Sequence, residues 1–277
     1  MVSADAAASV GKLDKLLEHG RKTVWNPAQD VDWAASSKAL EKLSAGDRQA
    51  LRSVLSLVYY SDSQGREILT SMCRGLDRDP GSREHPLAEK AHEFFVQQMD
   101  DEHRHATGLL LLLDRMRFEL EPRAFSHRFL SRFLVADRLF DAKLVLLYWY
   151  IEVLAKEIFV ELKKKFPETY VDSLFTRIIR DEARHVGFGE VFIPTHVATT
   201  QKLKRPQMAT AYYATAAALP GLFRVSHYAR AGARLGLDLR GMFSNGMNDI
   251  TDKALRLPAR QRFLDLKRPS IWASALL

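Results

Sequence analysis

Two short segments of the sequence repeat each other and contain side chains that bind metal ions. The first reads Asp-Glu-His-Arg-His at positions 101–105, and the second reads Asp-Glu-Ala-Arg-His at positions 181–185. In each segment a glutamate precedes a histidine by three residues, so in a helix both side chains lie on one face and can reach one point. Carboxylate and imidazole together suit iron or manganese. The repeat therefore predicts two metal ions held between two helices.

The predicted ligands in the two segments are Glu102 with His105 and Glu182 with His185. A single Glu-x-x-His is common on charged helix faces, where it is usually a solvated pair. Two copies 80 residues apart, with the same flanking Asp and Arg, favour a functional site.

A dinuclear site of this kind also needs one carboxylate from each of two further helices. Glu152 stands in the apolar stretch 148–154, where a buried charge is costly without a partner. It lies 15 residues before Pro167 and Glu182 lies 15 after, so a helical hairpin turning there puts both at one height. Glu157 is five residues nearer the turn, a mismatch of roughly 7 Å. We therefore predict Glu152 as the ligand and place Glu157 toward solvent.

The remaining carboxylate is either Glu67 or Asp62. Glu67 lies 35 residues before Glu102, similar to the 30 residues between Glu152 and Glu182, whereas Asp62 lies 40 before. Counted from the loop that follows, Asp62 fits a symmetric hairpin at least as well. The two positions are about 140° apart around a helix, so only one can face the site. We choose Glu67, whose neighbours one turn away are polar.

The segments that must position these residues have helical spacing of apolar residues and lack alternating strand patterns or hairpin turns. The predicted fold class is all-α. The expected helices cover about 45–76, 87–116, a short and then a long helix ending near 166, 168–193 before Pro194, and a long C-terminal helix from about 205 interrupted near 220–221. No linker rich in Ser, Gly or Pro divides the chain. We expect one domain, 1–277, with a core of about 45–196, a lead-in of 1–44 and a helical extension of 197–277.

Composition limits the function classes. The chain has 277 residues, 47% of them hydrophobic and 27% charged, with a net charge of +7. One cysteine, Cys73, excludes an internal disulfide framework and a Cys-rich zinc or iron–sulfur site. The apolar stretches are too short to span a membrane, and the N-terminus has no pattern of a secretory signal. A cytoplasmic protein without a membrane partner is the expectation.

The six ligand candidates together resemble a known group, the oxygen-activating branch of the ferritin-like dinuclear carboxylate proteins. Their order and spacing match that family's six-ligand pattern: Glu67, Glu102, His105, Glu152, Glu182 and His185. The lead-in at 25–33 is similar to segments preceding this core in ribonucleotide reductase small subunits, ligand-binding oxidases and p-aminobenzoate N-oxygenases. The resemblance implies a ferritin-like four-helix bundle with additional C-terminal helices. It also implies that Asp101 and Asp181 orient the two metal-bound histidines.

Three departures from the family pattern limit the reaction. Leu109 stands where the radical-generating reductase subunits carry a tyrosine, and residues 153–156 lack the threonine of some oxygenases. Ile178 stands where aminobenzoate N-oxygenases carry a further histidine. The metal site matches the family, while the reaction stays open.

The resemblance implies a dinuclear non-haem iron oxidase or oxygenase that uses O2 to hydroxylate, N-oxygenate or desaturate a small or carrier-bound substrate. Glu102, Glu152 and Glu182 would be its catalytic carboxylates. Two irons, or manganese and iron, would be the only cofactors, and electrons would come from an external donor or partner protein. The alternatives are an iron-storage protein, or a hydroxylase or desaturase acting on acyl carrier protein or tRNA. The scattered Lys and Arg do not favour nucleic acid, and a homodimer is compatible with the sequence.

The other histidines are assigned no role as ligands. His85 and His92 are expected at the surface, and His103 is expected off the site. Three more, His127, His196 and His227, are expected in the core or in a pocket. Gly187 and Gly189 are expected either to allow close helix packing, which we favour, or to leave room beside the site for substrate.

Overall fold

The computed structural model describes residues 4–78, 85–136, 139–199, 206, 208–214 and 227–238, and single residues at 241, 242, 245, 246, 248, 249, 252 and 256. Every named element in these residues is a helix, and their only strand-like pairing is an isolated bridge between Ser36 and Thr169. The all-α prediction is confirmed. None of the described helices combines the length and apolar character needed to cross a membrane.

The helices, in chain order, are α1 (Ala4–Lys22), α2 (Lys38–Glu41), α3 (Ala45–Ser63), α4 (Gly65–Arg78), α6 (Ala88–Arg115), α7 (Phe125–Val135), α8 (Phe140–Leu146), the π-helix η1 (Leu147–Ile151), α9 (Glu152–Lys165), α10 (Tyr170–Thr199) and α12 (His227–Arg234).

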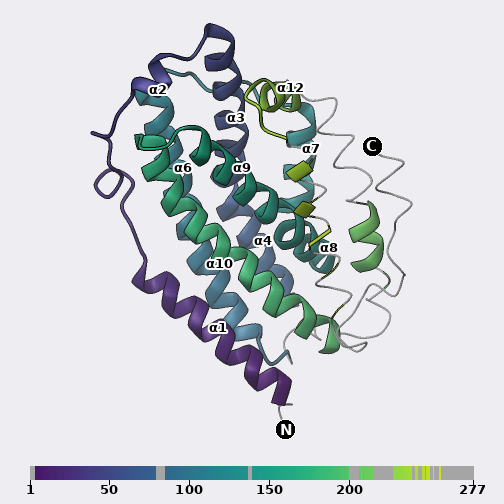
Figure 1. The fold of residues 1–277 in the computed structure, drawn as a ribbon. Coiled ribbons are helices and arrows are strands. Elements are labelled where there is room, and N and C mark those ends of the chain that lie inside the picture. Colours follow the sequence, from purple (N-terminus) through teal and green to yellow (C-terminus); the bar gives the residue numbers. More distant parts are fainter. Residues whose placement is uncertain are drawn as a thin grey trace.

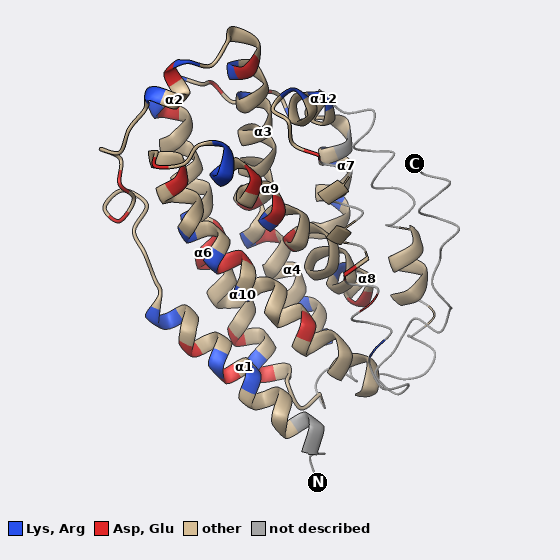
Figure 2. Ribbon diagram, in the orientation of Figure 1, with Lys and Arg blue, Asp and Glu red and all other residues tan. Residues whose placement is uncertain are grey.

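Two helical hairpins form the centre of the structure (Figure 1). One is made by α3 and α4 with α6, and the other by α9 with α10; α6 and α10 contact each other between them. Helix α1 lies along α6 and α10, and α12 packs on α3. Lys and Arg of the described residues are spread over many of these helices (Figure 2).

The interior has two apolar clusters separated along the helices by a polar layer. One cluster includes Leu69, Phe95, Tyr148 and Phe188. The other includes Val58, Leu109, Ile158 and Ile178. On each of the four helical segments the charged candidates fall between these two sets. The charged layer is therefore shielded from water at both ends, which increases the cost of leaving any of its groups unpaired.

The first predicted helix is interrupted where it reaches the polar layer. It begins as expected, because the Asp47 amide donates to the Ser44 side chain at 3.1 Å, which caps the helix. However, α3 ends at Ser63 and α4 begins at Gly65. A Cβ atom on Gly65 would lie 2.6 Å from the Cβ of Glu102. Only glycine permits α4 to approach α6 this closely at the level of the candidate ligands.

A π-helical turn interrupts the third predicted helix directly before Glu152. Single π turns are uncommon in proteins as a whole, and those that do occur often lie at functional sites. A Cβ atom on Gly189 of α10 would lie 2.6 Å from the Cβ of Tyr148 in η1. The prediction that Gly189 allows close packing is thus supported by its neighbour, whereas Gly187 has only ordinary contacts.

Other boundaries differ from the sequence prediction. The fourth helix does not stop before Pro194 but continues to Thr199, with Pro194 buried inside it. Proline in a helix costs ~3 kcal/mol, and buried neighbours such as Phe192 and Val197 offset this cost by packing. Sequence reasoning missed α1. The interruption expected at 220–221 lies outside the described residues.

Candidate metal centre

Six titratable side chains meet in the polar layer. They come from the last turn of α3, the middle of α6, the start of α9 and the middle of α10. All six are buried: Asp62, Glu102, His105, Glu152, Glu182 and His185. Buried charged groups of this number require partners, because neither apolar cluster offers any.

Two sets of three ligand atoms lie close enough to hold a metal ion each. Asp62, Glu102 and His105 form one set, and Glu102, Glu152 and His185 form the other. Within each set the ligand atoms all lie within 4.8 Å of one another. Glu102 belongs to both sets, so its carboxylate would help to hold either ion.

Both histidines turn Nδ1 toward the carboxylates. His105 Nδ1 lies 3.4 Å from Glu182 Oε1, and His185 Nδ1 lies 3.5 Å from Glu182 Oε2. His185 Nδ1 is also 3.3 Å from Glu152 Oε2. Glu182 therefore stands between the two imidazoles, as Glu102 stands between the two ligand sets. The two Glu-x-x-His segments face each other across a shared centre.

The outer nitrogens of the two histidines contact aspartates of the opposite helix. His105 Nε2 on α6 lies 3.3 Å from Asp181 Oδ2 on α10, and His185 Nε2 lies 3.2 Å from Asp101 Oδ2 on α6. With Nδ1 facing the centre, each Nε2–H donates to an aspartate. Such a hydrogen bond fixes the tautomer and ring orientation of a metal-binding histidine.

The aspartates are themselves held by buried or half-buried donors. Trp25 Nε1 donates to Asp181 Oδ2 at 2.7 Å, which connects the lead-in segment to the centre. Arg104 and Arg184 pair with the two oxygens of Asp101. Both aspartates are therefore held in place independently of the histidines.

Two residues that sequence reasoning missed complete the polar layer. Gln98 Nε2 donates to Glu102 Oε1 at 3.0 Å and to Glu152 Oε1 at 2.9 Å. Tyr148 OH donates to Gln98 Oε1 at 2.7 Å. The available signal was spacing, because Gln98 lies four residues before Glu102 and Tyr148 lies four before Glu152, each on its ligand's helix face.

Burial with too little positive charge nearby determines the pKa values of three of the carboxyl groups. It raises the pKa of Asp62 and of Glu152 well above their usual values, and the neighbouring carboxylates raise them further. The pKa of Glu102 rises for the same reasons, burial first and then Glu182. Without a cation, the cluster therefore retains protons on carboxyl groups.

The pKa values of Glu182 and of the two histidines shift in the direction opposite to the one that burial alone would cause. Burial alone would raise the pKa of Glu182, but the close imidazoles of His105 and His185 hold it well below its usual value. Burial alone would lower the pKa of both histidines, yet their hydrogen bonds to carboxylates raise it well above 6.5. The metal-free centre thus pairs protonated histidines with an ionised Glu182, while Asp62, Glu102 and Glu152 favour their neutral forms.

Among the described residues, three buried atoms at the centre lack a hydrogen-bond partner: Asp62 Oδ2, His105 Nδ1 and Glu182 Oε2. Each offers a lone pair to a cation once its group is deprotonated, and each belongs to a residue whose other contacts lie in this cluster. An unsatisfied buried polar atom costs about 1–3 kcal/mol. Metal cations would pair with all three, so the donor set fits a dinuclear metal site.

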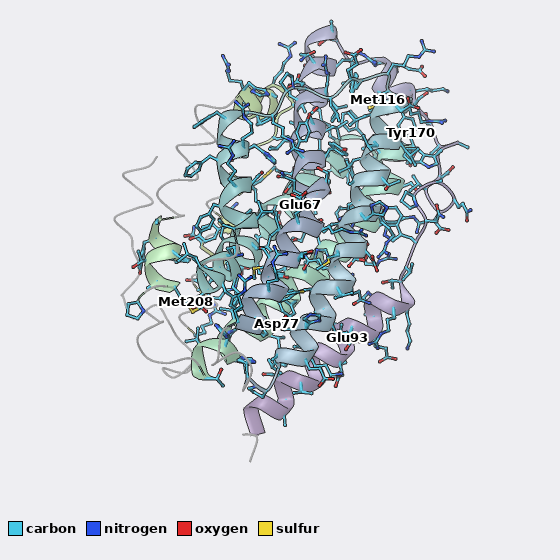
Figure 3. The ribbon with its side chains drawn as sticks, turned by 180° about the vertical axis from the view of Figure 1, so that it is seen from behind. Glu67, Asp77, Glu93, Met116, Tyr170 and Met208 are labelled. Atoms are coloured by element: carbon cyan, nitrogen blue, oxygen red, sulfur yellow. The ribbon has the colours of Figure 1, made fainter. Side chains whose placement is uncertain are left out.

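The placement predicted for Glu67 is wrong. Glu67 is exposed on α4, and Figure 3 labels it there. Asp62 takes the expected position at the centre. The inward face of this segment is formed by the buried residues Asp62, Gly65 and Leu69. Glu67 lies two residues beyond Gly65, about 200° around the helix, and therefore points away.

Most other side chains lie where the sequence placed them. Glu157 is outside the cluster and pairs with Lys156 at 3.3 Å. His92 and His103 are exposed. His85, expected at the surface, is instead buried against Phe192, with ring centroids 5.0 Å apart. It precedes α6 and accepts a hydrogen bond from the Leu87 amide, which holds it in the interior.

Comparison with models of known protein families finds no match, and comparison with curated proteins finds none either.

Proposed function

We propose that this chain is a dinuclear non-haem iron oxidase or oxygenase with a ferritin-like four-helix core. The observation that carries the proposal is the pair of three-ligand sets that share Glu102. Helix pairs that each present Glu-x-x-His, with one further carboxylate from each of two other helices, form dinuclear carboxylate sites in helical bundles.

Six side chains would hold the ions: Asp62, Glu102, His105, Glu152, Glu182 and His185. Four carboxylates balance the charge of two ferrous ions. Ions bound here in their reduced state would supply the activation of O2 for oxidation of an organic substrate. Manganese with iron accepts the same ligands, and an external donor would supply electrons.

The chain's own residues orient and insulate the centre. Asp101 and Asp181 accept the Nε2 protons of the two histidines and keep Nδ1 directed inward. Gln98 donates to Glu102 and Glu152 and holds these two carboxylates at a fixed separation. The two apolar clusters exclude water from either end of the layer. The Trp25–Asp181–His105 contacts offer a continuous hydrogen-bonded connection for electron supply.

An organic substrate, as opposed to stored iron, is supported by a cavity of about 110 Å³ beside the centre. Asp62, Glu102, Glu152 and Glu182 all line this cavity, and most of the remaining wall is apolar. Hydrophobic pockets with a few convergent polar groups are typical of small-molecule sites. An iron-storage protein needs no such space.

The first test is metal content per chain, measured by elemental analysis on protein produced with iron and manganese. We expect about two equivalents, as two irons or one of each metal. After chemical reduction, the loaded protein should consume O2. Near-zero metal after reconstitution would overturn the proposal, and many irons per chain would favour storage.

A matched pair of variants tests the ligand assignment within that experiment. Glu152→Ala should lose at least one metal equivalent, whereas Glu157→Ala on the same helix should lose none. The reverse result would contradict the assignment of the α9 ligand.

A further inference from the structure

The cavity beside the centre has walls of two chemical kinds. Most of it is apolar, from α3, α4, α7, η1 and α9, including Leu57, Ile68, Leu130, Leu134, Ile151 and Leu154. Burying apolar surface against such a wall contributes about 25 cal/mol per Å². The body of a molecule that binds here is therefore hydrocarbon, aliphatic or aromatic.

A polar patch of Gln64, His127 and Ser131 interrupts this apolar wall. The Ser131 hydroxyl contacts Gln64 Oε1 and lies 3.3 Å from His127 Nδ1, so it joins the other two side chains. Gln64 Nε2 and His127 Nε2 have no hydrogen-bond partner among the described residues. Gln64 Nε2 is a donor only, and His127 Nε2 is a donor in one tautomer. The patch therefore offers hydrogen bonds to an acceptor oxygen.

One exposed arginine, Arg123, lies near the patch. The Arg123 guanidinium lies 4.6 Å from the centre of the Tyr60 ring, and that ring lies 5.9 Å from His127. Burial and the charge of Arg123 lower the pKa of His127 to about 4. His127 is therefore neutral near pH 7, and Arg123 is the fixed positive charge beside the patch.

Another part of the wall of the same cavity carries the opposite charge. Asp62, Glu102, Glu152 and Glu182 line it. An anionic group is repelled from this side and attracted to the polar patch. An uncharged carbon chain tolerates the carboxylate side, above all when metal ions balance the charge there. The polar patch and the carboxylates thus favour one orientation of an amphiphilic ligand.

We infer that the cavity binds a monocarboxylic acid with an apolar body, its carboxylate accepting from Gln64 Nε2 and His127 Nε2 beside Ser131 and its carbon atoms directed at the centre. That this acid is the substrate rests on the proposed function, whereas its binding does not. Oxidation would then fall on carbon remote from the carboxylate. His127 and Gln64 are positioning residues in this arrangement.

The test is calorimetric binding of three probes with the same chain to the metal-loaded protein: octanoate, 1-octanol and octylammonium. Octanoate should bind at least tenfold more tightly than either of the others. Equal or tighter binding of octanol or octylammonium would overturn the inference. Absence of octanoate binding to protein with two metals would also overturn it and leave the metal centre intact.

Variants locate the carboxylate. Gln64→Glu keeps the side-chain shape but adds a negative charge, so octanoate binding should fall at least tenfold and octylammonium binding should rise. His127→Leu should weaken octanoate several-fold, while the matched His92→Leu at the exposed surface should leave it unchanged. Unchanged octanoate binding in Gln64→Glu would contradict the assignment.

A second measurement separates this inference from the proposed function. Ala155→Phe places a large side chain in the cavity wall without removing a ligand, and it should abolish octanoate binding while metal content stays at the wild-type level. Octanoate binding by protein that takes up no metal would support the cavity assignment and overturn the proposed function alone. Retained octanoate binding in Ala155→Phe would overturn the cavity assignment.

Discussion

Two pairs of buried histidines lie in this structure, and they differ in what surrounds them. The rings of His105 and His185 are 6.1 Å apart at the centre, and those of His85 and His196 are 5.4 Å apart near the ends of α6 and α10. Burial and ring spacing are similar. The composition of the two neighbourhoods is not.

Carboxylates surround the central pair. Each histidine there contacts carboxylates through Nδ1 and an aspartate through Nε2. In the second pair, His196 Nε2 contacts one carboxylate, Asp141, at 2.6 Å, and Phe192 packs against both rings. Within the described residues, three-ligand sets occur at the central pair alone.

The difference teaches that a pair of buried imidazoles does not by itself bring together a set of potential metal ligands. At the central pair, carboxylates raise the pKa of both histidines. At the second pair, burial and the neighbouring His196 lower the pKa of His85 to about 3. Several convergent carboxylates make the first neighbourhood attract cations. The second is an aromatic core with one polar contact.

The largest expected effect comes from replacing, with alanine, one carboxylate in each of the two histidine neighbourhoods. Glu102→Ala should lose both metals, because this carboxylate belongs to both ligand sets. Asp141→Ala, at the second pair, should keep both metals and lose only stability, by about 1–3 kcal/mol. Elemental analysis and thermal unfolding would measure the two effects. Two metals retained in Glu102→Ala would remove the basis of the comparison.

A smaller effect should distinguish the two candidates at the α3–α4 break. Asp62→Ala should lose one metal equivalent, because only one ligand set includes it. Glu67→Ala should keep two, since Glu67 is exposed. The measurement is metal content after dialysis. Loss of metal in Glu67→Ala with Asp62→Ala intact would restore the choice made from sequence spacing.

The outer aspartates should have a graded effect. Asp181→Asn and Asp101→Asn keep the side-chain size but weaken the hydrogen bonds to His105 and His185. Metal affinity should fall about 10–100-fold in each, as is typical when such a partner of a ligand histidine is lost. Competition with a chelator measures the affinity. Asp141→Asn is the control and should leave affinity unchanged; a tenfold loss there would count against the contrast.

The smallest effect concerns His85 and pH. Its pKa of about 3 in the folded protein lies below the 6.5 of the unfolded chain, so only the unfolded state takes up a proton between these values. This residue therefore lowers the free energy of unfolding by about 1.4 kcal/mol for each pH unit below 6.5.

The measurement is urea unfolding of metal-free wild type and His85→Asn at pH 7 and pH 5. The variant removes the titrating ring, so its free energy of unfolding should fall less than that of the wild type. Any loss of packing with Phe192 is the same at both pH values and cancels. An equal pH dependence in both proteins would contradict the buried, neutral state of His85.

Several features of this site could be predicted from sequence because they depend on local geometry. Glu and His three residues apart share a helix face whatever the tertiary structure is. The equal distances of Glu152 and Glu182 from Pro167 set their heights in a hairpin. Five of the six side chains at the centre are ones that these rules selected: Glu102, His105, Glu152, Glu182 and His185.

What the sequence by itself determined is therefore the all-α class and the pairing of carboxylate with imidazole on two helices. Only the tertiary structure decided between Asp62 and Glu67, because a break at Gln64 and the contact of Gly65 with α6 set the rotation of that segment. The tertiary structure alone brought Gln98 and Tyr148 together and buried His85. It also placed Asp101 against His185 and Asp181 against His105, each aspartate contacting the histidine of the other helix. These depend on how separate helices approach one another, and no periodicity within one helix encodes that approach.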